Sequence, residues 1–124
     1  MKNDQIRHMV ARLSLAVVFV GIGIWEIAQP SYWAMYVPGF VSALIRTNTF
    51  VMLHGITLLV IGLAVVLGAY LRIASGLAVL IMLSIVVDLT VTFGFDDIVI
   101  RDLGILLIAL ALFFDDTNYM RLRK

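Results

Sequence analysis

The chain has 124 residues, of which 63% are hydrophobic and 14% are charged, and its mean hydropathy is +1.10. A soluble domain is typically about half apolar and about a quarter charged, so this composition indicates a membrane protein with the lipid bilayer as its surroundings. The net charge of +1 gives no reason to expect a nucleic-acid partner, and the absence of cysteine excludes disulfides, thiolate metal sites and iron–sulfur ligation. The length suits a single domain, residues 1–124.

Four apolar stretches are candidates for transmembrane helices, since a span takes roughly 20 mostly apolar residues. The first follows a basic N-terminus, as in a signal peptide, but similar stretches follow it and no convincing cleavage site precedes Gln29, so we expect it to be retained. Asn48 or Thr49 can cap the second helix, and Asp96 or Asp97 the fourth. We predict an all-α fold, a four-helix transmembrane bundle with spans at about residues 9–28, 49–70, 72–93 and 98–114.

The segment between the first two spans, residues 30–48, is too short and too interrupted to cross the membrane. It concentrates aromatic residues, and Trp and Tyr favour the boundary between membrane and water, where a ring can be half wet. We expect a short interfacial helix from about Ser31 that is broken near Pro38 and Gly39; an aromatic-rich connecting loop is the alternative. The aromatic residues concerned are Tyr32, Trp33, Tyr36 and Phe40.

The distribution of Lys and Arg predicts the orientation in the membrane. With four spans both termini share one side, and that side collects seven of the nine basic residues, whereas Arg46 and Arg101 lie on the other. By the positive-inside rule both termini are then cytoplasmic, in a multi-pass protein of the cytoplasmic membrane. The seven basic residues are Lys2, Arg7, Arg12, Arg72, Arg121, Arg123 and Lys124.

Each predicted span carries an ionisable residue in its outer half: Glu26, His54, Asp88, and Arg101 with Asp102. At a rise of about 1.5 Å per residue, Asp88 lies roughly 9 Å and Asp102 roughly 6 Å below the outer ends of their helices. Charges in hydrocarbon are costly and usually have partners, so we predict an outward-facing polar pocket or ion-pair network. We expect Arg101 to pair with Asp88 or Glu26. The alternatives are side chains that extend to the headgroups, or an ion pair that only fixes helix register.

No cofactor motif accompanies these residues, since the sequence has no HExxH, no CxxC and no glycine-rich phosphate loop. His8 is expected at the cytoplasmic end of the first span and His54 on the outer side of the second, so they cannot share one haem within a subunit. His54 alone could ligate a group, but we favour a hydrogen-bonded histidine in a polar cluster. We therefore assign no catalytic residue, metal site or cofactor, and leave quinone or haem open without a supporting motif.

Several short motifs are similar to those of one family of small membrane proteins. Arg101-Asp102-Leu103-Gly104 opens the last predicted helix, as an arginine–aspartate motif does in that family. The other matching residues are Arg12, Phe19 and Gly23 in the first span, Pro30 to Pro38 with Trp33 and Tyr36-Val37-Pro38, and Gly62, Arg72, Ala74 and Gly76 around the central hairpin. On these residues the chain resembles the DoxX-like membrane proteins over nearly its full length, although many of them have a lysine where this chain has Glu26.

The resemblance implies a four-helix bundle of the cytoplasmic membrane in a bacterium or archaeon. Family members include a small subunit associated with a quinol oxidase and with thiosulfate:quinone oxidoreduction, and others are linked to membrane oxidoreductase complexes that handle oxidative stress. The bundle is also similar in shape to vitamin K epoxide reductases and quinone-linked disulfide enzymes, and the absence of cysteine argues against that chemistry here.

Our leading hypothesis is a non-catalytic membrane module: an accessory subunit of a quinone-linked redox complex, or a binder of a small amphipathic ligand in the outward polar pocket. A transporter of small molecules or protons is the first alternative, because intramembrane acids beside an arginine occur in such pathways. A quinone- or haem-dependent oxidoreductase is the second. Expected partners are the bilayer and membrane oxidoreductase subunits, and a homo-oligomer is left open.

Overall fold

The structure, a computed structural model, describes residues 2–68 and 70–114. Within these residues every regular element is a helix and there is no strand, which confirms the predicted all-α fold. The long helices are α1 (Lys2–Ala28), α4 (Thr47–Leu67), α5 (Leu71–Phe93) and α6 (Asp97–Phe113). Between α1 and α4 lie the short helix α2 (Pro30–Trp33), the 3₁₀ helix η1 (Ala34–Tyr36) and the short helix α3 (Gly39–Leu44).

Three of the long helices are long and apolar enough to cross a membrane: Gln5–Ala28 within α1, α4 and α5. The fourth, α6, has 17 residues, which is shorter than the roughly 20 of a typical span. The four predicted spans coincide with these four helices, with ends shifted by a few residues. The largest shift is at α1, which begins at Lys2 rather than near residue 9. The apolar pattern therefore located each helix, while polar residues extend the first one.

Local sequence explains how two of these helices end and begin. Gly68, directly after α4, has φ of 74°, a left-handed conformation that glycine adopts without the steric cost of a Cβ atom. This stops α4 earlier than the predicted boundary at residue 70. At the start of α6, Asp96 is the N-cap as predicted, and its Oδ1 accepts a hydrogen bond from the Val99 N–H at 3.2 Å.

The connecting segment differs in detail from the prediction. The expected break falls at Pro38, which is the extended N-cap residue of α3, but the part before it consists of α2 and η1 rather than one continuous helix. The predicted caps of α4 were wrong, because Asn48 and Thr49 lie inside the helix and its N-cap is Arg46. Arg46 is the last residue with extended backbone (ψ 132°) before the helix, and its side chain makes no capping hydrogen bond.

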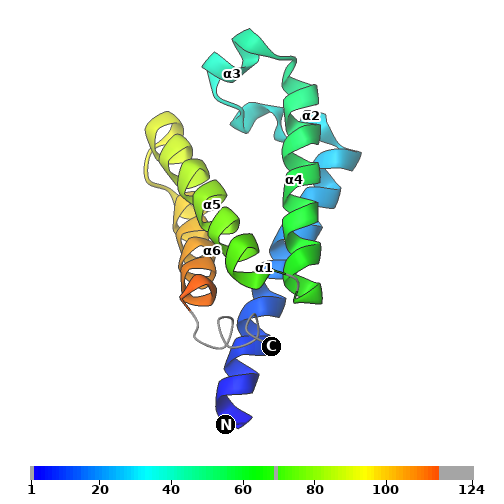
Figure 1. Cartoon of the computed structure of the whole chain (residues 1–124). Coiled ribbons are helices and arrows are strands. Elements are labelled where there is room, and N and C mark those ends of the chain that lie inside the picture. The colour runs from blue at the N-terminus through cyan, green and yellow to red at the C-terminus, as the bar shows by residue number, and fades with distance from the viewer. Residues whose placement is uncertain (1, 69, 115–124) are drawn as a thin grey trace.

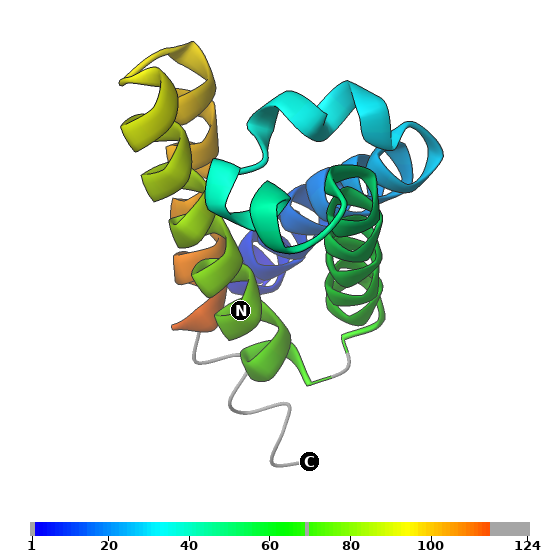
Figure 2. The same cartoon turned by 90° about the horizontal axis from the view of Figure 1, so that it is seen from above.

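The long helices form two closely packed pairs, α1 with α4 and α5 with α6. The pairs meet at the end where α1 begins and α4 and α6 end, and they diverge towards the other end (Figure 1). Seen from above, the connecting segment of α2, η1 and α3 runs from the α1–α4 pair towards α5 and back to the start of α4 (Figure 2). It therefore lies across the end where the pairs diverge.

The hydrophobic core occupies the half of the bundle where the pairs meet. Fully or almost fully buried side chains from all four long helices pack together there. The largest are Leu15 and Phe19 of α1, Val65 of α4, Leu71 of α5 and Leu112 of α6. These residues come from the first half of α5 and the last half of α4 and α6. A second, smaller cluster of Val86, Leu89 and Val99 lies at the other end of the α5–α6 pair, with Tyr36 of η1 packed against it.

Glycines allow α1 and α4 to approach within backbone contact. A Cβ atom on Gly23 would lie 2.7 Å from the carbonyl oxygen of Gly55, and one on Gly55 would lie 2.8 Å from the carbonyl oxygen of Gly23. A Cβ on Gly62 would meet Val20 at 2.7 Å. Small residues at such crossings let membrane helices pack closely. The contact of Gly23 with Gly55 lies one helical turn from Glu26 and fixes how its side chain faces α4.

Two arginines bind the ends of helices on the core side. Arg12 of α1 donates from Nε to the carbonyl oxygen of Val65 at 3.1 Å and from Nη2 to that of Val66 at 2.7 Å. These carbonyls belong to the last turn of α4, where backbone acceptors have no partner within the helix. The guanidinium of Arg72 lies 5.2 Å from the centre of the Phe113 ring, which ties the start of α5 to the end of α6.

Candidate functional site

A cavity of about 850 Å³ occupies the half of the bundle that the hydrophobic core leaves open. Its walls come from all four long helices and from the connecting segment. All five polar residues singled out from the sequence line it: Glu26 from α1, His54 from α4, Asp88 from α5, and Arg101 and Asp102 from α6. Residues with similar depths on four different helices therefore surround one space.

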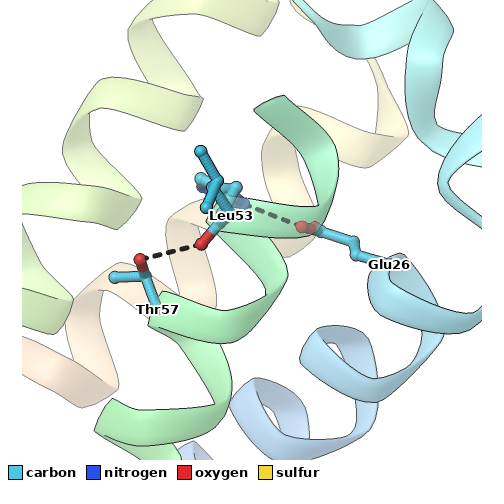
Figure 3. A network of polar contacts seen from close by, with 4 residues as sticks. Glu26, Leu53 and Thr57 are labelled. Atoms are coloured by element: carbon cyan, nitrogen blue, oxygen red, sulfur yellow. Dashed lines mark hydrogen bonds and ion pairs between the residues drawn. The ribbon is translucent and has the colours of Figure 1, made fainter. Parts of the chain in front are cut away.

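Glu26 and His54 form an ion pair or hydrogen bond across the interface of α1 and α4. His54 Nδ1 lies 2.9 Å from Glu26 Oε1, and the two side chains are 25% and 8% exposed. Figure 3 shows the Glu26 side chain extending from α1 towards α4, near the bond that Thr57 donates to the Leu53 carbonyl. An ionised carboxylate can only accept, so the proton between them then belongs to Nδ1 and the imidazole Nε2 remains for a further partner.

Arg101 pairs with its neighbour in the chain rather than with the residues expected. Its Nε lies 3.3 Å from Oδ1 of Asp102, and the expected pairing with Asp88 or Glu26 is not present among the described residues. The reason is geometric: successive residues of a helix point about 100° apart, so Asp102 faces inward, 7% exposed, while Arg101 is 57% exposed and reaches back to it. Glu26 already has His54 as its partner.

Asp88 has a different environment from the other two carboxylates of the cavity. It is partly buried and lines the cavity from α5. Among the described residues no side chain or backbone group forms a hydrogen bond or ion pair with it, whereas Glu26 and Asp102 each have one. The cavity thus contains one carboxylate without a protein partner.

Aromatic rings from the connecting segment and from the end of α1 form one wall of the cavity. Trp25 stacks on Tyr32 with ring centres 4.9 Å apart, and Trp33 makes edge contacts with both, at 5.3 and 5.4 Å. Tyr36 continues the series 5.9 Å from Trp33. The Trp25 indole N–H donates to Gln29, but the Trp33 Nε1 atom is buried and has no acceptor among the described residues. Trp33 therefore lines the cavity with its ring, while its indole N–H is enclosed by protein without an acceptor among the described residues.

The sequence identified four of these rings only as interfacial residues. All four line the cavity: Tyr32, Trp33, Tyr36 and Phe40. The prediction that they lie at the membrane boundary did not include this role. Phe19 also lines the cavity, and two further aromatic residues of the wall that were not singled out as part of the site each have a signal in their spacing. They are Trp25, which precedes Glu26, and Phe50, which lies four residues before His54 and stacks on its ring at 6.1 Å.

The chemistry of the site is that of binding rather than of metal ligation. Within residues 2–68 and 70–114 no group of three or more His, Asp or Glu side chains is placed to hold a metal ion. The arrangement combines apolar and aromatic walls with two polar pairs and a free carboxylate. Such a combination can orient a small molecule that has both apolar and polar parts.

Comparisons with known proteins add no relative to this description. No protein-family model matches the chain, and neither a curated protein nor a solved structure matches it. The resemblance to the DoxX-like proteins thus remains an expectation that rests on the motifs described above.

Proposed function

We propose that the chain is a four-span protein of the cytoplasmic membrane with both termini in the cytoplasm. α6 has 17 residues, and at about 1.5 Å per residue it is roughly 25 Å long, close to the hydrocarbon thickness of about 30 Å. It packs along α5, which is long enough to span. The four helices alternate in direction (Figure 1), so the basic residues Arg12 and Arg72 lie at the same end, as the positive-inside rule requires of a cytoplasmic side.

Within that frame we propose that the protein is a non-catalytic module that binds a small amphipathic molecule, with a quinone as the leading candidate. The observation that carries this proposal is the cavity of about 850 Å³. Pockets for small ligands have volumes of about 300–1,000 Å³, mostly apolar walls and a few well-placed polar groups, and this one has all three properties. The DoxX-like resemblance supplies the quinone and the further role as an accessory subunit of a quinone-linked redox complex.

The walls provide complementary groups for each part of a quinone. Its flat ring can stack against Trp25, Tyr32 or Trp33, because aromatic pairs prefer offset or edge contacts. Its two carbonyl oxygens need donors, and the Arg101 guanidinium, which lines the cavity, has several N–H groups. Its apolar tail can follow aliphatic side chains of α5 such as Leu83. The transporter alternative receives less support, since the apolar core fills the opposite half of the bundle.

The two tryptophans of the chain give a direct assay, because both line the cavity. We expect decylubiquinone to quench their fluorescence in a saturable manner when the protein is in lipid nanodiscs, after subtraction of quenching in empty nanodiscs. Mass spectrometry of protein purified in native lipid should find endogenous quinone. Unsaturable quenching together with no retained quinone would refute quinone binding.

A matched pair of substitutions on α5 locates the binding. Ile85 lines the cavity, whereas Ile81, one turn away and also partly buried, does not. Ile85→Phe should fill part of the cavity and weaken decylubiquinone binding roughly tenfold, a loss of about 1.4 kcal/mol. Ile81→Phe carries the same change in volume and should leave the affinity within about twofold. Equal effects of the two variants would place the quinone elsewhere.

A further inference from the structure

The cavity has an excess of acidic groups. Its lining includes three carboxyl side chains, Glu26, Asp88 and Asp102, and among the described lining residues Arg101 is the one permanent cation. Glu26 is bonded to His54 and Asp102 to Arg101, so two carboxylates have a basic partner inside the protein. Asp88 has none among the described residues. The carboxylate of the lining without a compensating basic group is therefore Asp88.

The low-polarity surroundings make that imbalance significant. A carboxylate in an apolar medium is costly unless a counter-charge or hydrogen bonds compensate it. The other residues that line the cavity with Asp88 are mostly apolar or aromatic, among them Tyr36 and Leu89. An organic cation in the cavity would supply the counter-charge and also bury its own apolar groups.

Aromatic walls favour the same class of ligand. Trp and Tyr rings attract cations through the negative potential of their faces, and groups of such rings recognise quaternary ammonium ligands. The lining contains Trp25, Tyr32, Trp33, Tyr36 and Phe40 on the side of the connecting segment. An anion of the same size would meet the same rings with the unfavourable sign and would face an unpaired carboxylate.

We propose that the cavity selects lipophilic organic cations, such as quaternary or protonated amines with apolar substituents, over anions of equal size, with Asp88 as their counter-ion. This rests on the proposed function of the same cavity as a binding site for a small amphipathic molecule. The proposal adds a preference for positively charged ligands. A neutral quinone would contact the same walls without pairing with Asp88.

Two ions of nearly equal shape and opposite charge test the proposal. Tetraphenylphosphonium and tetraphenylborate are each titrated into the protein in nanodiscs, with tryptophan fluorescence and equilibrium dialysis as readouts and empty nanodiscs as the blank. We expect the cation to bind at least tenfold more tightly than the anion and to compete with decylubiquinone. Binding of both ions with equal affinity, while decylubiquinone still binds, would overturn the selection by charge and leave the proposed function intact.

The remaining outcomes separate the two proposals. A preference for the cation with no binding or competition by decylubiquinone would overturn the quinone assignment and support the cation. No binding of any of the three probes would overturn both proposals. The comparison of the two ions uses the unmodified protein, so it does not depend on whether a variant folds.

Asp88→Asn tests the role of the counter-ion, because it keeps the size of the side chain and removes the charge. We expect it to reduce tetraphenylphosphonium affinity about tenfold and to abolish most of the preference over tetraphenylborate. Asp97→Asn is the matched control, since Asp97 is exposed in the first turn of α6 and does not line the cavity. An unchanged preference in a folded Asp88→Asn protein, checked by size-exclusion chromatography, would remove Asp88 from the proposal.

Discussion

The bond between Glu26 and His54 joins a buried and a half-buried side chain on different helices at a distance of 2.9 Å. Removing one partner of a buried pair leaves the other without compensation, whereas replacing both by apolar residues is often neutral or stabilising. The pair therefore need not stabilise the bundle to be important. Its consequence is that a variant with only one of the two residues has an uncompensated polar group at this depth in the bundle.

A double-mutant cycle measures this dependence. Glu26→Leu should destabilise the bundle by about 3 kcal/mol, because the polar His54 ring loses its partner, and the double variant with His54→Leu should recover most of that loss. Glu26→Gln keeps a hydrogen-bonding side chain and should cost less than Glu26→Leu. Reversible unfolding in mixed micelles gives the free energies. Additive losses in the double variant would show that the two residues act independently.

Arg101 illustrates which part of the site the sequence could predict. The position of a residue along a span gives its depth, and depth was enough to group Glu26, His54, Asp88 and the Arg101–Asp102 pair around one cavity. Pairing also depends on the rotation of each helix about its axis, and one residue changes that direction by about 100°. One sequence without contacts contains no measure of this rotation, so the partner of Arg101 was predicted incorrectly.

At the scale of elements, the crossing of α1 and α4 depends on Gly23 and Gly55, whose missing Cβ atoms allow the backbones to touch. The Glu26–His54 bond lies beside this crossing, and cavity-lining residues lie on both sides of it along the two helices. Small residues allow membrane helices to pack closely, but one sequence does not identify which glycines face a neighbouring helix. Gly21 and Gly104 have the same residue type and no neighbour within reach of a Cβ atom.

Two substitutions on α1 separate the effect of the contact with α4 from the effect of replacing a glycine within the helix. Gly23→Ala places a methyl group 2.7 Å from the Gly55 carbonyl oxygen and should destabilise the bundle by about 1–3 kcal/mol, the usual range for overpacking. Gly21→Ala has open space around the new methyl group and should be neutral or stabilising by up to about 1 kcal/mol, because alanine favours the helix. Thermal unfolding in the same detergent compares them. A loss of stability in both variants would mean that α1 packs differently.

At the scale of the whole molecule, the larger apolar core fills one half of the bundle, and the cavity lies in the other half beside the smaller cluster of Val86, Leu89 and Val99. Hydrophobicity alone predicted four helices of suitable length but no cavity, because every span is apolar on all sides and its pattern does not distinguish a core contact from a lipid contact. The two helix pairs diverge (Figure 1) away from the end where the larger apolar core lies, and the connecting segment lies across the end where they diverge. Neither feature has a periodic signature in the sequence.

The membrane topology depends on whether the 17 residues of α6 cross the bilayer. The chain has no cysteine, so single cysteines report sidedness without a background signal. Three exposed positions suit this assay: Asn3 at the start of α1, Phe95 between α5 and α6, and Phe114 after α6.

With four spans, a membrane-impermeant maleimide added to intact cells should label Phe95→Cys. It should label Asn3→Cys and Phe114→Cys only after permeabilisation. Labelling of Phe95→Cys and Phe114→Cys from the same side would exclude α6 as a span, and labelling of Asn3→Cys in intact cells would reverse the orientation. Because the polar cavity lies at the end of the bundle near Phe95, the same experiment decides whether ligands reach it from the outer side of the membrane.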